Sequence, residues 1–343
     1  MNFRSDNEAP AHPRMLEALI EANQGTATAY AEDALSSRLD EVFSDLFETP
    51  CTVLPLATGT AANSITLSAM CPPWGAVMCH RNAHIANDEG GAPEFYTHGA
   101  KLVLLEGEKG QLQPRALAAA IDSAGGHGVH NVKPSAVSIT QATECGTSYR
   151  PDQIAALAEV AHARDLPLHM DGARFANAVQ FLNVTPADIT WRAGVDALSF
   201  GASKNGALAA EAIVVFGHPE WLEPMQRMRK RGGHLLSKMR YVSAQLLAMI
   251  EHDLWLELAG QANRQAARIA AAVERDPGMS LVWPVEANEV FLRAAPERLE
   301  ALAEAGFGFH RWPGFDDVAR LVCSFATTDD EVEALIKAME TRT

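Results

Sequence analysis

Between residues 51 and 216, short apolar runs alternate with segments of helical periodicity, and this alternation restricts the fold more than any other feature of the sequence. The runs are short for helices, but they have the length of strands that are buried on both faces. Helices between them would supply the crossovers that parallel strands need. We therefore expect an α/β fold with a mostly parallel seven-stranded sheet and helices on both faces. The predicted strands are 51–56, 76–80, 101–106, 136–141, 166–170, 196–200 and 212–216, and the helices between them include 113–124, 151–165 and 174–182.

The two ends of the chain have a different pattern. Apolar side chains recur at helical spacing in 13–23 and 34–48, before the first strand. After about residue 218, long helical segments precede short strand-like runs, which predicts a smaller α+β domain. We expect an N-terminal arm (1–14), a large domain (15–245) and a small C-terminal domain (246–343). The tail is predicted to contain helices 219–250 and 254–275, strands 279–283, 288–293, 307–312 and 318–325, and a final helix 328–341.

Charge and composition exclude some classes of function. The formal net charge of −15 argues against nucleic acid or an anionic membrane as the main partner, because both require a basic surface. The five cysteines are odd in number and contain no C-x-x-C pair, which favours a reducing compartment. The first residues have no signal-peptide pattern, and no apolar run reaches the roughly 20 residues that span a bilayer. We therefore expect a soluble, cytoplasmic protein.

A turn with the sequence Ala57-Thr58-Gly59-Thr60-Ala61-Ala62-Asn63 leaves the first predicted strand and enters a helix. Glycine lets the backbone come close to a ligand, and the N–H groups of a helix N-terminus can hold an anion. Thr58 and Thr60 add hydroxyl donors. By itself this turn favours a capped helix start over a phosphate site, so its meaning depends on the two motifs that follow.

Two charged residues come directly after predicted strands. Asp171 follows the run Leu168-His169-Met170, and Lys204 follows Leu198-Ser199-Phe200 within a segment of small residues. Open α/β sheets bind ligands at the carboxyl edge of their strands. A carboxylate there can keep a ring nitrogen protonated, and a lysine with a lowered pKa can form an imine. Alternatively, Asp171 caps the next helix and Lys204 lies on the solvated surface.

Together these three motifs are the parts of a pyridoxal 5′-phosphate (PLP) site: a phosphate turn, an acid for the ring nitrogen and an amine for the aldehyde carbon. The sequence therefore predicts a PLP enzyme of fold type I, with an aspartate-aminotransferase-like fold and the cofactor held as a Schiff base on Lys204.

The chain resembles the threonine aldolases of the β-eliminating lyase group over nearly its whole length. Within that family it is most similar to the low-specificity L-threonine (phenylserine) aldolases. The motifs that carry the resemblance are Ser5-Asp6, Tyr30-Ala31-Glu32-Asp33, T-G-T-A-A-N (58–63), Ala83-His84 with Glu89-Gly90-Gly91, I-T-Q-A-T-E (139–144), M-D-G-A-R (170–174) and S-K-N-G (203–206).

The resemblance implies a role for each matched residue around the cofactor ring. Lys204 would carry the Schiff base, and Asp171 would pair with the pyridine nitrogen. His84 would stack on the ring face with Glu89 close by. Arg174 would lie near the ring oxygen and the substrate carboxylate.

It also implies phosphate ligands. Thr58, Gly59 and Thr60 would hold the phosphate from the turn. Basic residues of 227–240 would reach it partly from a neighbouring subunit, with Lys230, Lys238 and Arg240 as the candidates. The alternative for this basic stretch is a solvated helical face.

For the substrate, the resemblance implies contacts from Ser5, Tyr30 and Arg320 in addition to Arg174. His130 is expected near the β-hydroxyl as a base, with a water near His84 as the alternative. The chain departs from the family at Ala142-Thr143-Glu144, where many members have N-T-H, so its pocket wall is expected to differ.

The function implied is retro-aldol cleavage of L-threonine, L-allo-threonine and related β-hydroxy-α-amino acids to glycine and an aldehyde, by a homodimer or homotetramer with its site at the dimer interface. Another PLP reaction (β-elimination, transamination or glycyl transfer) is the alternative. A non-catalytic PLP-binding protein is disfavoured because the expected catalytic groups are present, and a dinucleotide-binding oxidoreductase because no G-x-G-x-x-G opens the first helix. His80 and His84 lack a third ligand, so no metal site is expected.

Overall fold

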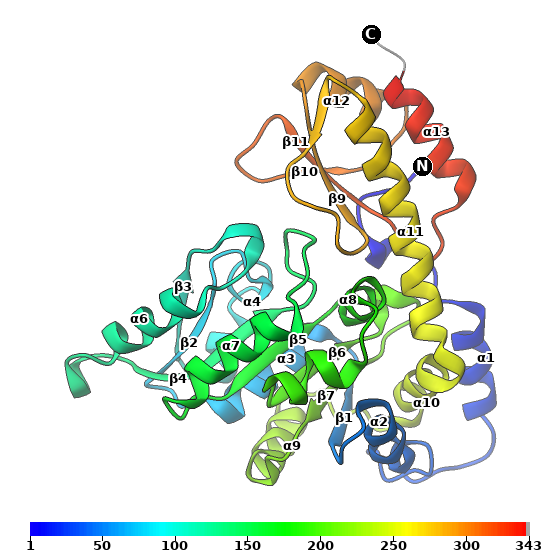
Figure 1. Ribbon diagram of the computed structural model, residues 1–343. Helices are drawn as coiled ribbons and strands as arrows, with labels where there is room; N and C mark the ends of the chain where they lie inside the picture. Colours follow the sequence, from blue (N-terminus) through cyan, green and yellow to red (C-terminus); the bar gives the residue numbers. More distant parts are fainter. Residues whose placement is uncertain (341–343) are drawn as a thin grey trace.

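The computed structural model describes residues 1–340, which form a large α/β body with a smaller unit above it (Figure 1). The large body contains a seven-stranded sheet in the order β1-β7-β6-β5-β4-β2-β3. β7 pairs antiparallel with β1 and β6, and the other pairs are parallel, which confirms the mostly parallel sheet. The strands are β1 (Thr52–Leu56), β2 (Gly75–His80), β3 (Lys101–Leu105), β4 (Lys133–Thr140), β5 (Leu168–Gly172), β6 (Ala197–Gly201) and β7 (Glu211–Val215).

Helices lie on both faces of this sheet, as Figure 1 shows, and the central strands β5, β6 and β7 are buried at every position. Proline occupies the first turn of α1, α6 and α7, where its missing N–H would have had no helical partner. The helices of the large body are α1 (Pro13–Ala22), α2 (Leu39–Phe47), α3 (Gly59–Met70), α4 (His84–Asn87), α5 (Ala92–Tyr96), α6 (Pro114–Ala124), α7 (Pro151–His162), α8 (Phe175–Leu182), α9 (Leu222–Arg231) and α10 (Arg240–Ile250).

The single helix predicted over 219–250 was wrong. α9 ends at Arg231 and α10 begins only at Arg240. Gly232 and Gly233 lie between them, and Gly233 adopts a φ of 80°, which a residue with a Cβ rarely takes. A Cβ on Gly232 would come within 2.4 Å of the Tyr96 hydroxyl, so glycine is needed where the chain turns.

The smaller unit contains a four-stranded antiparallel sheet in the order β10-β11-β9-β8. It has its own buried cluster, which includes Ile269, Leu292 and Leu335. The predicted final helix is observed, although its residue 341 lies outside the described residues. The expected boundary at 245/246 falls inside α10. The elements of this unit are α11 (Leu254–Arg275), β8 (Met279–Leu281), β9 (Glu289–Ala294), α12 (Pro296–Glu304), β10 (His310–Arg311), β11 (Val318–Val322) and α13 (Asp329–Glu340).

α11 joins the two units, because its first turn packs into the large body (Figure 1). Trp255 is fully buried and stacks on Phe175, with ring centroids 6.1 Å apart and planes 8° apart. Its backbone carbonyl accepts a hydrogen bond from the Asn205 side chain at 2.8 Å. The first turn of α11 therefore supports the segment that carries Lys204.

The N-terminal arm also joins the units. Phe3 is buried in the core of the small unit, where its N–H donates to the Gly308 carbonyl and its own carbonyl accepts from Val322, both at 2.8 Å. The chain then enters the short 3-10 helix Asp6–Glu8 and reaches the large body, where Asp6 pairs with Arg174. None of the described helices is both long and apolar enough to cross a membrane.

Candidate active site

A cavity of about 250 Å³ lies at the sheet edge where β1, β5 and β6 end and β7 begins. The strand-end positions explain why residues far apart in the sequence meet here, since parallel strands present their carboxyl ends at one edge. The residues that line the cavity are Asn7, Ala57, Thr58, Gly59, Thr60, Asn63, His84, Glu89, Asp171, Ala173, Ser203, Lys204 and Glu211.

The turn after β1 supplies an anion-binding end to this cavity. The Thr58 side chain caps α3 by accepting a hydrogen bond from the N–H of Ala61 at 3.3 Å. A Cβ built on Gly59 would meet no heavy atom within 4 Å, so the space in front of the helix N-terminus is open. A twelve-residue helix such as α3 presents free N–H groups and the positive end of its dipole there.

A hydrogen-bonded chain of side chains forms one wall of the cavity. The Asn63 amide nitrogen donates to Asp171 at 2.9 Å and to Glu89 at 2.8 Å. Glu89 in turn contacts His84 Nδ1 at 2.9 Å. The second oxygen of Asp171 accepts from the N–H of Ala173 at 3.0 Å. Asn63 therefore fixes both carboxylates, a role that its place in the T-G-T-A-A-N turn did not reveal.

The His84–Glu89 pair holds protons to higher pH than the isolated side chains would. The hydrogen bond to Glu89 raises the pKa of His84, and this effect exceeds the lowering by burial. Burial raises the pKa of Glu89. The pair, with Asp171, is also the one His/Cys/Asp/Glu group among the described residues close enough to hold a metal ion. His80 does not join it, because its Nε2 contacts the Gly107 carbonyl at 3.0 Å.

Two carboxyl groups near the cavity, those of the buried Glu211 and the half-buried Glu144, were not assigned a role from the sequence. Glu211 accepts a hydrogen bond from the N–H of Ser203 at 3.3 Å, and burial raises its pKa to about 7. Glu144 accepts from the N–H of His84 at 2.8 Å, and burial likewise raises its pKa to about 7. In the sequence, Glu144 stood out because it departs from the N-T-H of many family members. Glu211 could have been noticed only as a charged residue at the start of an apolar strand.

The two expected carboxylate-binding arginines lie in a chain of alternating charges that crosses between the units. Arg174 pairs with Asp6 at 2.8 Å and with Glu289 at 3.4 Å, and Glu289 lies 3.8 Å from Arg320. Burial raises the pKa of Asp6, but the charges of Arg174 and Lys204 outweigh it, so the net pKa is lowered. Both guanidinium groups are therefore held in place by carboxylates.

The structure does not bring the other expected residues to this cavity. Ser5 caps the 3-10 helix that leads to Asn7, which does line the cavity. Tyr30 is exposed, and the Lys230 ammonium lies 4.2 Å from its ring centroid. Lys238 is exposed and Arg240 is half-buried. Tyr30 and these basic side chains therefore belong to the outer surface of the chain and not to the wall of its own cavity.

The role expected for His130 is not supported. His130 is exposed in the 3-10 helix Gly128–His130, which precedes the amino end of β4. The cavity lies at the opposite end of that strand, beyond Thr140, and an eight-residue strand spans roughly 23 Å. The predicted strand 136–141 also begins after His130, so the order of the chain agrees with this position, and the expected role rested on the resemblance alone.

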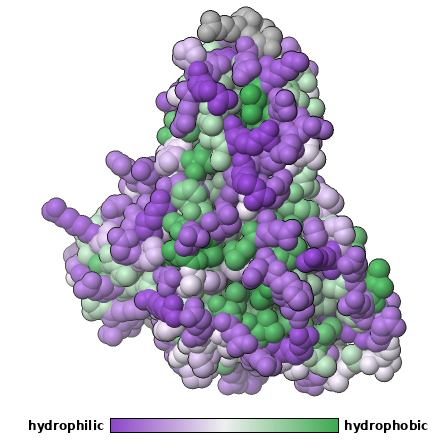
Figure 2. All heavy atoms as spheres, turned by 45° about the vertical axis from the view of Figure 1, so that its right-hand side comes forward, coloured by the Kyte–Doolittle hydropathy of each residue, from purple (hydrophilic) through white to green (hydrophobic). Residues whose placement is uncertain are grey.

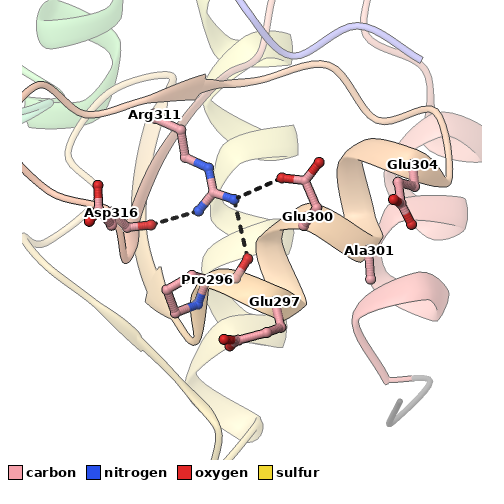
Figure 3. A pocket seen from close by; sticks show the side chains of 7 residues that line it. All are labelled: Pro296, Glu297, Glu300, Ala301, Glu304, Arg311 and Asp316. Carbon is pink, nitrogen blue, oxygen red and sulfur yellow. Dashed lines mark hydrogen bonds and ion pairs between the residues drawn. The ribbon is translucent and has the colours of Figure 1, made fainter.

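A larger hollow of about 570 Å³ lies on the small unit, between α12 and the segment that carries Arg311. Figure 3 shows that Arg311 points to Glu300, Asp316 and the Pro296 carbonyl, so its guanidinium is already engaged. Among the described residues that line the hollow there is no lysine, serine, threonine, cysteine or histidine, and the hollow is open to solvent. The chemistry of the site therefore belongs to the smaller cavity at the sheet edge.

Comparison with known proteins gives matches over nearly the whole chain. A family model described as beta-eliminating lyase matches residues 2–296. A low specificity L-threonine aldolase of Pseudomonas aeruginosa is 42% identical over 98% of this chain and 96% of that protein. One from another Pseudomonas strain is 41% identical, over 97% and 95%.

Solved structures agree with these matches. A threonine aldolase of Leishmania major has a TM-score of 0.92 at 26% identity and covers 99% of this chain and 98% of its own. An aspartate aminotransferase of Thermus thermophilus shares the fold, with a TM-score of 0.71 at 18% identity over 96% of this chain and 88% of its own. The expected aspartate-aminotransferase-like fold is thus confirmed, and the chain belongs to the beta-eliminating lyase family of PLP-dependent enzymes.

Proposed function

We propose that this chain is a PLP-dependent aldehyde-lyase that cleaves L-threonine, L-allo-threonine and related L-β-hydroxy-α-amino acids, such as phenylserine, to glycine and an aldehyde. The observation that carries the proposal is one cavity that joins the Lys204 amine, the Asp171 carboxylate and the N-terminus of α3. The relatives named low specificity L-threonine aldolase, at 41% and 42% identity, support the reaction type.

The residues around the cavity fit PLP. The cofactor needs an amine for its aldehyde carbon, an acid for its ring nitrogen and donors for its phosphate. Lys204, Asp171 and the Thr58–Thr60 turn supply these three, and all line the cavity. The open space at Gly59 leaves room for a phosphate. Asn63 Oδ1 is also buried without a hydrogen-bond partner among the described residues, as expected of a polar wall that faces a ligand.

When bound, PLP supplies an electron sink for the pair released as the Cα–Cβ bond breaks. Lys204 would hold the cofactor through its side-chain amine. Asp171, oriented by Asn63 and the Ala173 N–H, would keep a proton on the ring nitrogen. His84, which lines the cavity and is fixed by Glu89, would lie beside the ring.

The substrate is held and deprotonated by side chains from both units. In this proposal Arg174 and Arg320, which pair with Asp6 and Glu289 and do not themselves line the cavity, would bind its carboxylate. That task suits planar guanidinium groups. With His130 at the opposite strand end, the His84–Glu89 pair is our proposed acceptor, directly or through a water, for the β-hydroxyl proton. Loss of that proton releases the aldehyde, and a proton returned to Cα completes glycine.

Lys204→Ala tests this proposal. We expect purified enzyme to absorb near ~420 nm, from its Schiff base with PLP, and to form glycine and acetaldehyde from L-threonine. Lys204→Ala should lose both the band and at least about 10³-fold in kcat, because the covalent hold on the cofactor is gone. Lys133→Ala, which removes an exposed lysine from the amino end of β4, is the control and should keep both.

The products decide between reactions of the same cofactor. Glycine with an aldehyde supports the aldolase. Ammonia with a keto acid would instead show elimination, and a band without any turnover would leave only a PLP-binding protein.

We further propose a homodimer or homotetramer in which the face around Tyr30 and Lys230 completes the cavity of a partner copy. Tyr30 and Lys230 contact each other on the surface but do not line their own cavity. Exposed apolar side chains accompany them on α1 and in the loops that pack against it, namely Leu16, Ile20, Leu208 and Leu236. Figure 2, which turns the α1 side forward, shows apolar atoms across the lower part of the molecule.

The remaining assignments are proposals of the same kind. A cytoplasmic location fits the acidic composition and the unpaired cysteines. The division into residues 1–14, 15–245 and 246–343 stays a proposal, supported by the two separate sheets, and its boundaries fall inside α1 and α10.

A further inference from the structure

Glu211 occupies the phosphate end of the cavity because of its place in the sheet. It is the first residue of β7 and pairs with Leu56, the last residue of β1, on one side and with Gly201 of β6 on the other. The turn that contains Thr58 and Gly59 begins directly after Leu56. Glu211 therefore lies beside that turn, and it lines the same cavity.

The cavity offers too little positive charge to neutralise both a bound phosphate and an ionised Glu211. Among the described residues that line the cavity, Lys204 is the only ammonium or guanidinium group. His84, Glu89 and Asp171 are the other titratable groups there, and two of these three are acids. Asp171 raises the pKa of Glu211, and Lys204 lowers it, but burial is the largest influence and leaves the pKa near 7.

We propose that Glu211 is a neutral carboxyl ligand of the cofactor phosphate, and that PLP binding therefore takes up a proton at this residue. The carboxyl O–H would donate to a phosphate oxygen, while the Ser203 N–H continues to donate to Oε1. This inference rests on the proposed PLP site and adds a ligand of unusual charge state to it.

The direction of the proton transfer follows from the two acids. The second pKa of a phosphate monoester is about 6, below that of Glu211, so a proton shared between them resides on the carboxyl. Binding also places a phosphate anion beside Glu211. This second negative charge raises the pKa of Glu211 further, so above pH 7 each bound PLP requires one proton from solvent.

The test compares PLP with pyridoxal, which has the same aldehyde and ring but no phosphate. Dissociation constants of the apoenzyme are measured from pH 7 to 8.5, where the phosphate is already fully ionised. Over this range, the factor by which the Kd for PLP rises should be about ten times larger in wild type than in Glu211→Gln, whose side chain cannot ionise. Pyridoxal should show no such difference between the two proteins, since titration at Lys204 affects both ligands alike.

Glu94→Gln is the matched control, because Glu94 is a partly buried glutamate on α5 that does not line the cavity. It should behave like wild type. Parallel PLP curves for wild type and Glu211→Gln would overturn the proposal. A uniform loss of affinity in Glu211→Gln at every pH would also overturn it, and would mean that the ionised carboxylate holds a cation instead.

A measurement on wild type alone covers the case in which Glu211→Gln does not fold. Titration calorimetry at pH 8, in two buffers of different ionisation enthalpy, counts the protons exchanged. We expect close to one more proton taken up with PLP than with pyridoxal, and no excess uptake would contradict the inference. Absence of PLP binding altogether would instead remove the proposed function, so the two failures are distinguishable.

Discussion

Glu144 is a half-buried residue whose carboxylate is only partly hydrogen-bonded within the described part of the chain. Its Oε1 accepts from the His84 N–H at 2.8 Å and from the Thr140 hydroxyl at 2.9 Å. Its Oε2 is buried and has no hydrogen-bond partner among the described residues. An ionised carboxylate is poorly solvated in such a place, which is why the pKa rises from 4.5 to about 7.

The raised pKa of Glu144 predicts how the stability of the Glu144→Gln variant depends on pH. Because the folded-state pKa exceeds the unfolded one, the proton on Glu144 stabilises the fold below about pH 4.5, and this contribution is lost as pH rises through 7. Glutamine keeps the acceptor and cannot ionise. Relative to wild type, the variant should therefore gain up to about 3 kcal/mol in the free energy of unfolding between pH 4.5 and 8. Urea unfolding at four pH values measures this gain, and a difference that stays constant with pH would refute it.

For single residues, the sequence predicts a position in the site when the residue comes soon after a predicted strand. Lys204, Asp171 and Gly59 each adjoin a predicted strand, and the structure brings them to one cavity. The sequence could not place Glu211, because a charged residue is expected to be exposed, and only the packing of neighbouring elements buries it. Glu144 was marked as part of the pocket wall by its departure from the family pattern, but its hydrogen bonds to His84 and Thr140 could not be predicted.

The helix α11 shows how one element connects the two units. Its first turn inserts Trp255 against Phe175 and Phe200 of the large body, with centroid distances of 6.1 and 5.9 Å. The same turn accepts the Asn205 hydrogen bond next to Lys204. The helix continues along the large body as far as Asn263, which hydrogen-bonds to Asn177 and Gln180 of α8. Its later residues pack on the small unit, with Ile269 and Val273 in the core of that unit.

We expect Trp255→Ala to cost about 3–5 kcal/mol of unfolding free energy, because it removes a large buried ring and leaves a cavity. Trp255→Phe keeps a ring on Phe175 and removes an indole N–H that has no partner among the described residues, so it should cost less than half as much. Denaturant titration of both variants is the measurement. Equal losses would show that ring packing is not the source of the stability.

The sequence predicted the positions of helices and strands where a short stretch of apolar residues defined the element by itself. The predicted strand 212–216 is observed as β7 at Glu211–Val215, and the predicted helix 254–275 is observed unchanged. The antiparallel direction of β7 could not be read from the sequence, because an apolar run of five residues looks the same in either direction. The break after α9 was missed because helical periodicity continues across Gly232 and Gly233.

For the whole molecule, the proposed assembly predicts the effect of a charge on α1. Ile20 is 67% exposed there, and Ile20→Glu would have to bury a carboxylate if α1 lies in a subunit interface. We expect the variant to sediment as a monomer and to lose most of its aldolase activity. Phe315→Glu, at a 46% exposed site on the small unit, is the control and should leave the assembly intact. Sedimentation velocity distinguishes the outcomes, and an unchanged oligomer in Ile20→Glu would exclude α1 from the interface.

The N-terminal arm has a consequence for biosynthesis. The amino group of Met1 bonds to the carbonyl of Gly306, 305 residues further along the chain, and Phe3 completes a core whose other members come mostly from beyond residue 266. During synthesis the arm leaves the ribosome long before those partners exist. The arm must therefore stay undocked until the segment beyond residue 266 has emerged. Closure of so long a loop is slow, so docking of the arm is expected to be a late step of folding.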